Sequence, residues 1–245
     1  MLSKDKEVKA CYSKFSRPML DAPITVRIKF CKVGNLQFIS HLDLQRAFYR
    51  ILVRAGIPMW YTKGFNPHAK LVFGLPLSVG TESVCEMADL RIERQISLEE
   101  IKDQLNANLT DEMYVLDAYI PTTKFADIAY AKYTLTVESD KMPDNALSQI
   151  AKLFFVSAPI MMTKRSKSGE REVDIKSFIK DITAEVQDNT LRINAVLSAG
   201  STENLNPEYL ITAIKQNTDI FADGHNVSYR IMRETVYDAN MKEFC

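Results

Sequence analysis

The sequence predicts an α+β protein built from two tandem ferredoxin-like units, each a split βαβ arrangement with an antiparallel sheet. Three observations favour this fold. The chain has 245 residues, enough for two domains of ordinary size. Strand and helix patterns follow one another as strand, helix, two strands, helix and strand in residues 24–121, and the same order recurs in residues 130–238. With 46% hydrophobic and 25% charged residues, the composition excludes a disordered chain.

Residues 1–23 are polar and lysine-rich, have neither helical nor strand periodicity, and end at two prolines. They predict a flexible N-terminal arm before the first domain. The domain then opens on ITVRIKF, where apolar residues alternate with Arg27 and Lys29, as in a half-buried strand.

The first predicted helix starts at Ser40, whose side chain is expected to cap it, with Asp43 three residues on in the manner of a capping box. Apolar residues recur at helical spacing up to Ala55, and Gly56 ends the helix. The remaining elements of this domain are expected to be strands at 58–62, 70–75 and 84–93, a helix at 98–108 capped by Ser97, and a strand at 114–121.

The second domain shows the same order without any repeated motif. We expect strands at 133–139, 159–165, 182–186, 191–198 and 227–237, a basic turn at 167–172, and helices at 143–154 and 207–216.

Charge is unevenly distributed along the chain. The 31 basic and 31 acidic residues cancel overall, but residues 1–81 carry a net charge of +9 and the remainder −9. A basic half predicts a surface that attracts polyanions. Alternatively, the two halves attract each other across an internal interface.

Arg46, Arg50 and Arg54 follow one another at i+4 on one side of the first helix, with Asp43 on the same side. Guanidinium groups bind phosphate through two parallel hydrogen bonds, so this row suits a nucleic acid. The alternative is a solvated basic face.

The loop YTKGFNPHAK combines aromatic rings, cations and an amide, which suits unpaired nucleotides: its candidate residues are Tyr61, Lys63, Phe65, Asn66, His68 and Lys70. Alternatively, the loop is merely ordered, with Phe65 inserted in the core and Asn66 and His68 satisfying backbone groups. Trp60 is expected in the core.

The histidines suit two other kinds of chemistry. His41 and His68, with Asp43 and Glu86, offer metal ligands, but their spacing matches no dedicated motif and we predict no metal. They could also act as acid and base in RNA cleavage. A structural hydrogen bond is the preferred interpretation for His41.

The predicted basic turn of the second domain and the strand before it add Lys164, Arg165 and Lys167 as further candidate RNA contacts, although such charge runs are usually solvated. The four cysteines form no CxxC pair, and the glycines form no phosphate-binding fingerprint. No apolar run approaches the ~18 residues needed to span a bilayer, and no signal peptide is evident. We therefore expect a cytoplasmic protein without a membrane partner.

At SHLDLQRAF, RAGIP, YTKGFNPHAK and PLSVGTES followed by Glu86, the sequence resembles the uncharacterised radical-SAM-associated (radical SAM-linked) domain family, over residues 25 to about 235. Slight departures are Thr62 for the usual serine, Ala69 for proline, and Val53 where a basic residue often stands.

The resemblance implies a partner more than an activity. Members of that family are fused to, or encoded beside, a radical SAM protein with a cobalamin-type domain, often near genes for an endoribonuclease and ribosomal proteins. This chain has no CxxxCxxC cluster, so the radical chemistry would reside in the partner, and we predict no cofactor here. The tandem architecture also resembles CRISPR repeat-processing endoribonucleases, an analogy of fold that transfers no catalytic residue.

Together these features predict a non-catalytic RNA-binding accessory protein that presents a structured RNA, ribosomal or transfer RNA, to a separate radical SAM enzyme. The alternatives are a metal-independent endoribonuclease or small-molecule enzyme using His41 and His68, and a protein-interaction subunit whose basic face meets an acidic partner.

Overall fold

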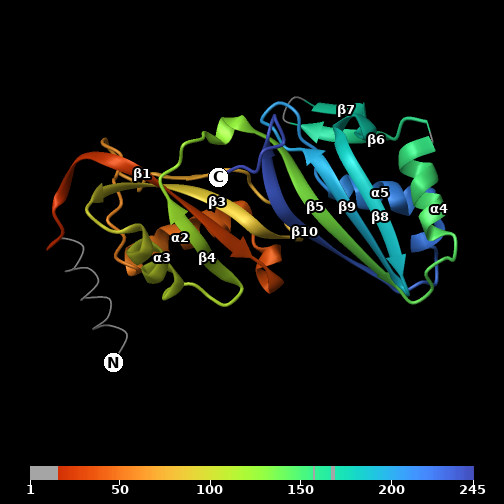
Figure 1. The fold of residues 1–245 in the computed structure, drawn as a ribbon, viewed down its shortest axis with the longest axis horizontal. Helices are drawn as coiled ribbons and strands as arrows, with labels where there is room; N and C mark the ends of the chain where they lie inside the picture. Colours follow the sequence, from red (N-terminus) through yellow and green to blue (C-terminus); the bar gives the residue numbers. More distant parts are fainter. Residues whose placement is uncertain (1–15, 157, 167–168) are drawn as a thin grey trace. The chain divides into compact units, whose positions relative to one another are not determined.

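The computed structural model describes residues 16–156, 158–166 and 169–245, and the chain divides into two units (Figure 1). The first unit runs to Phe125 and also includes Cys245, whereas the second comprises Ala126–Phe244. Both combine a few helices with antiparallel sheet, so the α+β class is confirmed.

The described part of the first unit is built from strands and α-helices. In chain order these are β1 (Met19–Lys32), α2 (His41–Arg54), β2 (Leu71–Phe73), β3 (Thr81–Arg94), α3 (Leu98–Asn106) and β4 (Met113–Tyr119), with a 3-10 turn at Gly34–Phe38 after β1. β1 pairs with β4 and β3, and β2 pairs with β3 on its other edge; every pair is antiparallel.

The core of this unit lies between the sheet and its two helices. Alternation along β1 places Val26, Ile28 and Phe30 on the helix-facing side, where they are at most 1% exposed. Helix α2 contributes Leu44, Phe48, Ile51 and Leu52 at helical spacing to the same cluster. Packing on this stripe leaves the opposite side of α2 exposed.

Both predicted helix caps are present. The Ser40 hydroxyl accepts a hydrogen bond from the Asp43 amide, and the Ser97 hydroxyl accepts one from the Glu100 amide. At α2 the box closes through side chains, because the Asp43 carboxylate accepts from the Ser40 hydroxyl at 2.7 Å. These caps fix where each helix begins.

The first strand starts before the end of the expected arm. Residues 19–23 belong to β1, with Met19 opposite Arg94, and the Arg17 guanidinium pairs with the Glu100 carboxylate. A register shift between Met19 and Ile24 accommodates this irregular part of the strand. Residues 1–15 of the expected arm lie outside the described residues.

The expected strand at 58–62 is reduced to two isolated bridges, Met59 with Ile92 and Tyr61 with Ala69. Single backbone hydrogen bonds join this segment to β3: the Glu93 amide donates to the Pro58 carbonyl, and the Trp60 amide donates to the Arg91 carbonyl. The segment that follows instead turns back on itself.

The described part of the second unit is likewise built from strands and α-helices. In chain order these are β5 (Ile128–Ser139), α4 (Ala146–Ala151) continued by a π-helical turn (Lys152–Val156), β6 (Met161–Ser166), β7 (Gly169–Asp174), β8 (Ile179–Gln187), β9 (Thr190–Ser198), α5 (Glu208–Asn217) and β10 (Val227–Asp238). The sheet order is β10-β5-β9-β8, all antiparallel, while β6 and β7 form a separate hairpin.

The hairpin differs from expectation, since residues 169–172 of the predicted basic turn belong to strand β7. Helix α4 also begins three residues later than the pattern predicted. In the part of the chain that the structure describes, every helix is too short or too polar to span a bilayer.

Candidate nucleic-acid interface

Residues 60–70 form a hairpin (the 60–70 hairpin) beside α2. The Thr62 amide donates to the His68 carbonyl at 3.0 Å, and the Lys70 amide donates to the Trp60 carbonyl at 3.0 Å. The Trp60 amide donates in turn to the carbonyl of Arg91 in β3 at 2.7 Å. The base of the hairpin is therefore anchored to the sheet.

The tip of the hairpin projects an aromatic ring into solvent. Gly64 has a φ of 137°, a conformation that favours glycine, and no atom lies within 4 Å of where its Cβ would be. The next residue, Phe65, has a relative exposure of 110%. Phe65 therefore does not enter the core, and Lys63 and Asn66 beside it are also exposed.

His68 belongs to the hairpin's own hydrogen-bond network although it is exposed. Its Nδ1 lies 3.1 Å from the Thr62 hydroxyl and 3.3 Å from the Asn66 carbonyl, and its backbone amide donates to the same hydroxyl. Thr62 departs from the serine of the resembled pattern but keeps the hydroxyl that these contacts need.

The three arginines of α2 lie in different environments. Arg46 forms an ion pair with Asp43 at 3.0 Å, with both side chains more than half exposed. The Ser40 hydroxyl, and secondly Arg46, hold the pKa of Asp43 below its usual value. Arg54 donates through Nε to the Asn108 side chain at 3.0 Å and through Nη2 to the Asn108 carbonyl.

Arg50 differs from Arg46 and Arg54. It is exposed, and it makes no hydrogen bond or ion pair with the residues that the structure describes. Between Leu44 and Thr81 the chain carries five Lys and Arg residues and no Asp or Glu. This segment, which comprises most of α2 and the whole hairpin, is therefore uniformly positive.

A small groove separates α2 from the 60–70 hairpin. Its volume is about 180 Å³, and its lining consists of Tyr49, Leu52, Val53, Ile57, Met59, Tyr61, His68 and Ala69. Arg46 and Arg50 precede Tyr49 and Val53 by three residues, so they are their neighbours on the helix surface. The sequence-based site omitted Tyr49 and Val53, although their i, i+4 spacing marks one helix face.

His41 and Glu86 lie apart from this exposed surface. His41 is half-buried at the start of α2, where its ring lies edge-on to Phe73 with centroids 5.2 Å apart. Glu86 is 3% exposed on β3, opposite Phe30 of β1. Glu86 is therefore not positioned to contact a large ligand.

The candidate cations of the second half belong to the second unit. The Lys164 ammonium donates to the Asn204 carbonyl and side-chain oxygen at 2.5 and 3.2 Å, and it lies 5.2 Å from the Phe178 ring centroid. Burial, and secondly Arg171, lower the pKa of Lys164. In the β6–β7 backbone register Arg165 is paired with Glu170, and Lys167 lies outside the described residues.

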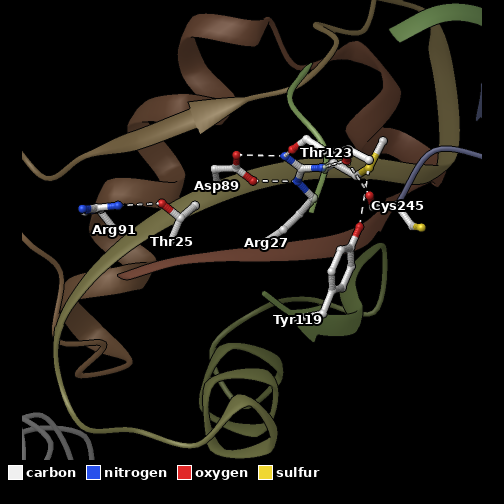
Figure 2. A network of polar contacts seen from close by, with 8 residues as sticks. Thr25, Arg27, Asp89, Arg91, Tyr119, Thr123 and Cys245 are labelled. Carbon is white, nitrogen blue, oxygen red and sulfur yellow. Dashed lines mark hydrogen bonds and ion pairs between the residues drawn. The ribbon is translucent and has the colours of Figure 1, made fainter. Parts of the chain in front are cut away.

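A buried polar network lies on the side of the first sheet that faces away from α2 (Figure 2). Arg27 is 0% exposed and donates to both carboxylate oxygens of Asp89 at 2.7 and 3.0 Å and to the Thr123 hydroxyl at 2.8 Å. That hydroxyl donates to the Cys245 carbonyl, and the guanidinium carbon lies 4.1 Å from the Phe125 ring centroid.

Because Arg27 is fully buried and its guanidinium is bonded to Asp89 and Thr123, the network stabilises the unit. In the described parts of the chain, no group of three or more His, Cys, Asp and Glu side chains could hold a metal ion.

Comparisons with known proteins identify a family but no function. The family described as "Uncharacterized protein conserved in bacteria (DUF2344)" matches residues 25–207. No curated protein matches the chain.

Among solved structures, the chain is similar to one from a Cbf5-Nop10-Gar1 complex, with 12% identity, a TM-score of 0.47, and coverage of 86% of this chain and 48% of that one. The present chain thus spans about half the length of that relative. It is also similar to an unknown protein from Galdieria sulphuraria, with 7% identity, a TM-score of 0.25, and coverage of 85% and 98%. A third is a putative glycine cleavage system transcriptional repressor, with 13% identity, a TM-score of 0.23, and coverage of 86% and 98%. Likenesses this distant carry no functional argument.

Proposed function

The chain belongs to the DUF2344 family of uncharacterized proteins conserved in bacteria, and on that premise we propose that it binds RNA, without catalysing a reaction, through α2 and the 60–70 hairpin. One observation carries the proposal. Phe65 is wholly exposed at the tip of an anchored hairpin, within a segment that has five cations and no acidic residue.

The magnitudes favour a ligand that uses both features. Leaving a phenylalanine in water forgoes about 1.5–3 kcal/mol of burial free energy. Stacking on an unpaired base is worth about 1–3 kcal/mol, so the ring regains that stabilisation when an RNA binds. The phosphates of the same RNA would neutralise Arg50 and the lysines, so one ligand uses both features.

We propose that each unit is ferredoxin-like, because the two sheets have the same order of strands. In the first unit the strands lie side by side in the order β4-β1-β3-β2. The fourth strand of the unit along the chain is therefore followed across the sheet by the first, the third and the second. In the second unit β10-β5-β9-β8 repeats this order once the β6–β7 hairpin is set aside as an insertion. Two ferredoxin-like units in tandem account for both sheets.

The partner belongs to the same proposal. The motifs SHLDLQRAF and YTKGFNPHAK resemble those of radical-SAM-associated domains. We therefore propose that the bound RNA, ribosomal or transfer RNA, is presented to a separate radical SAM enzyme. This part of the proposal depends on the resemblance alone.

The experiment measures the affinity of the full chain for a fluorescently labelled structured RNA. Phe65→Ser and Arg50→Gln should each weaken binding about tenfold, and raising salt from about 50 to 200 mM should weaken parental binding at least tenfold. Phe155→Ser is the matched control, because Phe155 is 64% exposed in the second unit. Both Phe65→Ser and its control should leave the unfolding midpoint nearly unchanged.

Three results would contradict the proposal. The first is a parental protein that binds no RNA at low salt, and the second is a Phe65→Ser variant that binds as well as its parent. The third is cleavage of the RNA without added metal that disappears in His41→Ala or His68→Ala, which would identify a nuclease.

A further inference from the structure

We propose that the groove between α2 and the 60–70 hairpin holds a single unstacked nucleobase of the bound RNA. This inference rests on the proposed RNA binding and adds to it the chemical group that the site selects. Neither the family description nor the motifs assign any ligand to this groove.

The groove has the size and walls of a site for one planar ring. Its floor is fully buried, with Ile57 and Met59 at 0% and 1% exposure. Its volume of about 180 Å³ is below the range of about 300–1,000 Å³ for drug-sized ligands, so a base fits and a whole nucleotide does not. Tyr49 on α2 and Tyr61 on the hairpin supply aromatic walls.

Charge at the helix edge of the groove distinguishes a base from an apolar peptide side chain. Arg46 and Arg50 lie one helical turn from the lining residues Tyr49 and Val53. A base enters the groove attached to a phosphate backbone that these cations neutralise, whereas an apolar side chain would leave them without a role.

His68 provides a polar group at the wall. Its Nδ1 is occupied by Thr62 and Asn66, whereas its Nε2 makes no hydrogen bond with a described residue. The Nε2 atom is therefore available to a base edge. Because the backbone bonds between Thr62 and His68 hold this wall in place before a ligand arrives, little ordering free energy is lost on binding.

The test uses three RNAs with the same stem: one with a single bulged base, one with an abasic residue at that position, and one fully paired. The parental protein should bind the bulged-base RNA about tenfold more tightly than the abasic RNA, as expected for one stacked base. In Val53→Trp, an added indole fills the groove without removing any charge, so the variant should bind both RNAs equally, at the parental affinity for the abasic one.

Val53 is 62% exposed, so the larger side chain meets no core. Leu147→Trp adds the same ring at a 43% exposed position of α4 in the second unit, and it should keep the tenfold preference. Equal binding of the bulged-base and abasic RNAs by the parental protein overturns the inference without any variant. If folded Val53→Trp still prefers the bulged-base RNA over the abasic RNA, the inference is also overturned. Absence of binding to all three RNAs at low salt overturns the RNA-binding proposal itself, together with this inference.

Discussion

At the scale of single residues, Arg27 of the first unit is a fully buried cation with several bonding partners. Its charge is neutralised by Asp89 of the neighbouring strand, and its remaining donors are matched by Thr123 (Figure 2). Phe125 lies against the guanidinium, and Gly74 leaves the space that this ring occupies, since a Cβ there would lie 2.6 Å from it.

Removing the guanidinium should therefore be costly. Arg27→Met leaves the Asp89 carboxylate without its partner, and the free energy of unfolding should fall by about 3 kcal/mol. Urea denaturation followed by circular dichroism measures this. The double variant Arg27→Met, Asp89→Leu removes both charges and should recover part of the loss; a single variant as stable as its parent would contradict a structural role for the pair.

Tyr119, beside this network, should titrate late. Burial raises the pKa of Tyr119 to about 12, although Arg27 opposes the shift. Because the folded pKa exceeds the unfolded value of about 10, the contribution to stability is complete below pH 10 and is lost as pH rises toward 12. Ultraviolet absorbance titration should show one tyrosine ionising near pH 12, and Tyr119→Phe should abolish that step. Full ionisation of all tyrosines by pH 11 in folded protein would be the opposite result.

At the scale of elements, α2 divides its arginines between binding and structure. Arg54 ties the end of the helix to Asn108 after α3, whereas Arg50 has no partner among the described residues. One side of the same helix therefore carries Arg54, which stabilises the fold, and Arg50, which is available to a ligand.

Matched substitutions should separate the two roles. Arg54→Gln should lower the free energy of unfolding by about 0.5–1.5 kcal/mol, the worth of a hydrogen bond, whereas Arg50→Gln should leave it unchanged. Thermal unfolding of the two variants in parallel gives the comparison. Equal destabilisation by both changes would show that Arg50 is also held by the fold.

Local signals explain what the sequence could predict of these elements. Ser40 and Ser97 were predicted as caps because each bonds to an amide only three residues away. Strand β7 was missed because its glycine and charged residues are typical of a turn, and only pairing with β6 makes it a strand.

The candidate site was predictable only in part, for the same reason. The composition of the loop indicates Phe65 and His68 as candidates. Predicting the groove, however, requires knowing which side of α2 faces the hairpin, and helical periodicity does not give this. Alternation placed Arg27 on the polar face of its strand. Its complete burial depends on Thr123 and Phe125, almost a hundred residues away.

At the scale of the whole molecule, the basic stretch of the chain, residues 1–81, lies within the first unit. The acid-free segment belongs entirely to the first unit, and in the second unit Lys164 is already bonded to Asn204. The RNA contacts that we propose therefore lie in the first unit, in residues 41–70.

Ultraviolet cross-linking of the full chain to bound RNA, followed by peptide mass spectrometry, should locate the contacts. Cross-linked peptides should come from residues 41–70, because aromatic rings and cations lie together there, and not from residues 126–244. Cross-links confined to the β6–β7 hairpin would place the RNA on the second unit instead.

The position of Trp60 gives the protein an optical reporter. It is the single tryptophan of the chain, bonded through its backbone to Arg91 and Lys70 at the base of the hairpin. Its neighbours Met59 and Tyr61 both line the groove. Intrinsic emission excited at the red edge of the indole band therefore comes from one place, the base of the hairpin, and stopped-flow mixing of unlabelled protein with RNA measures whether that base changes on binding.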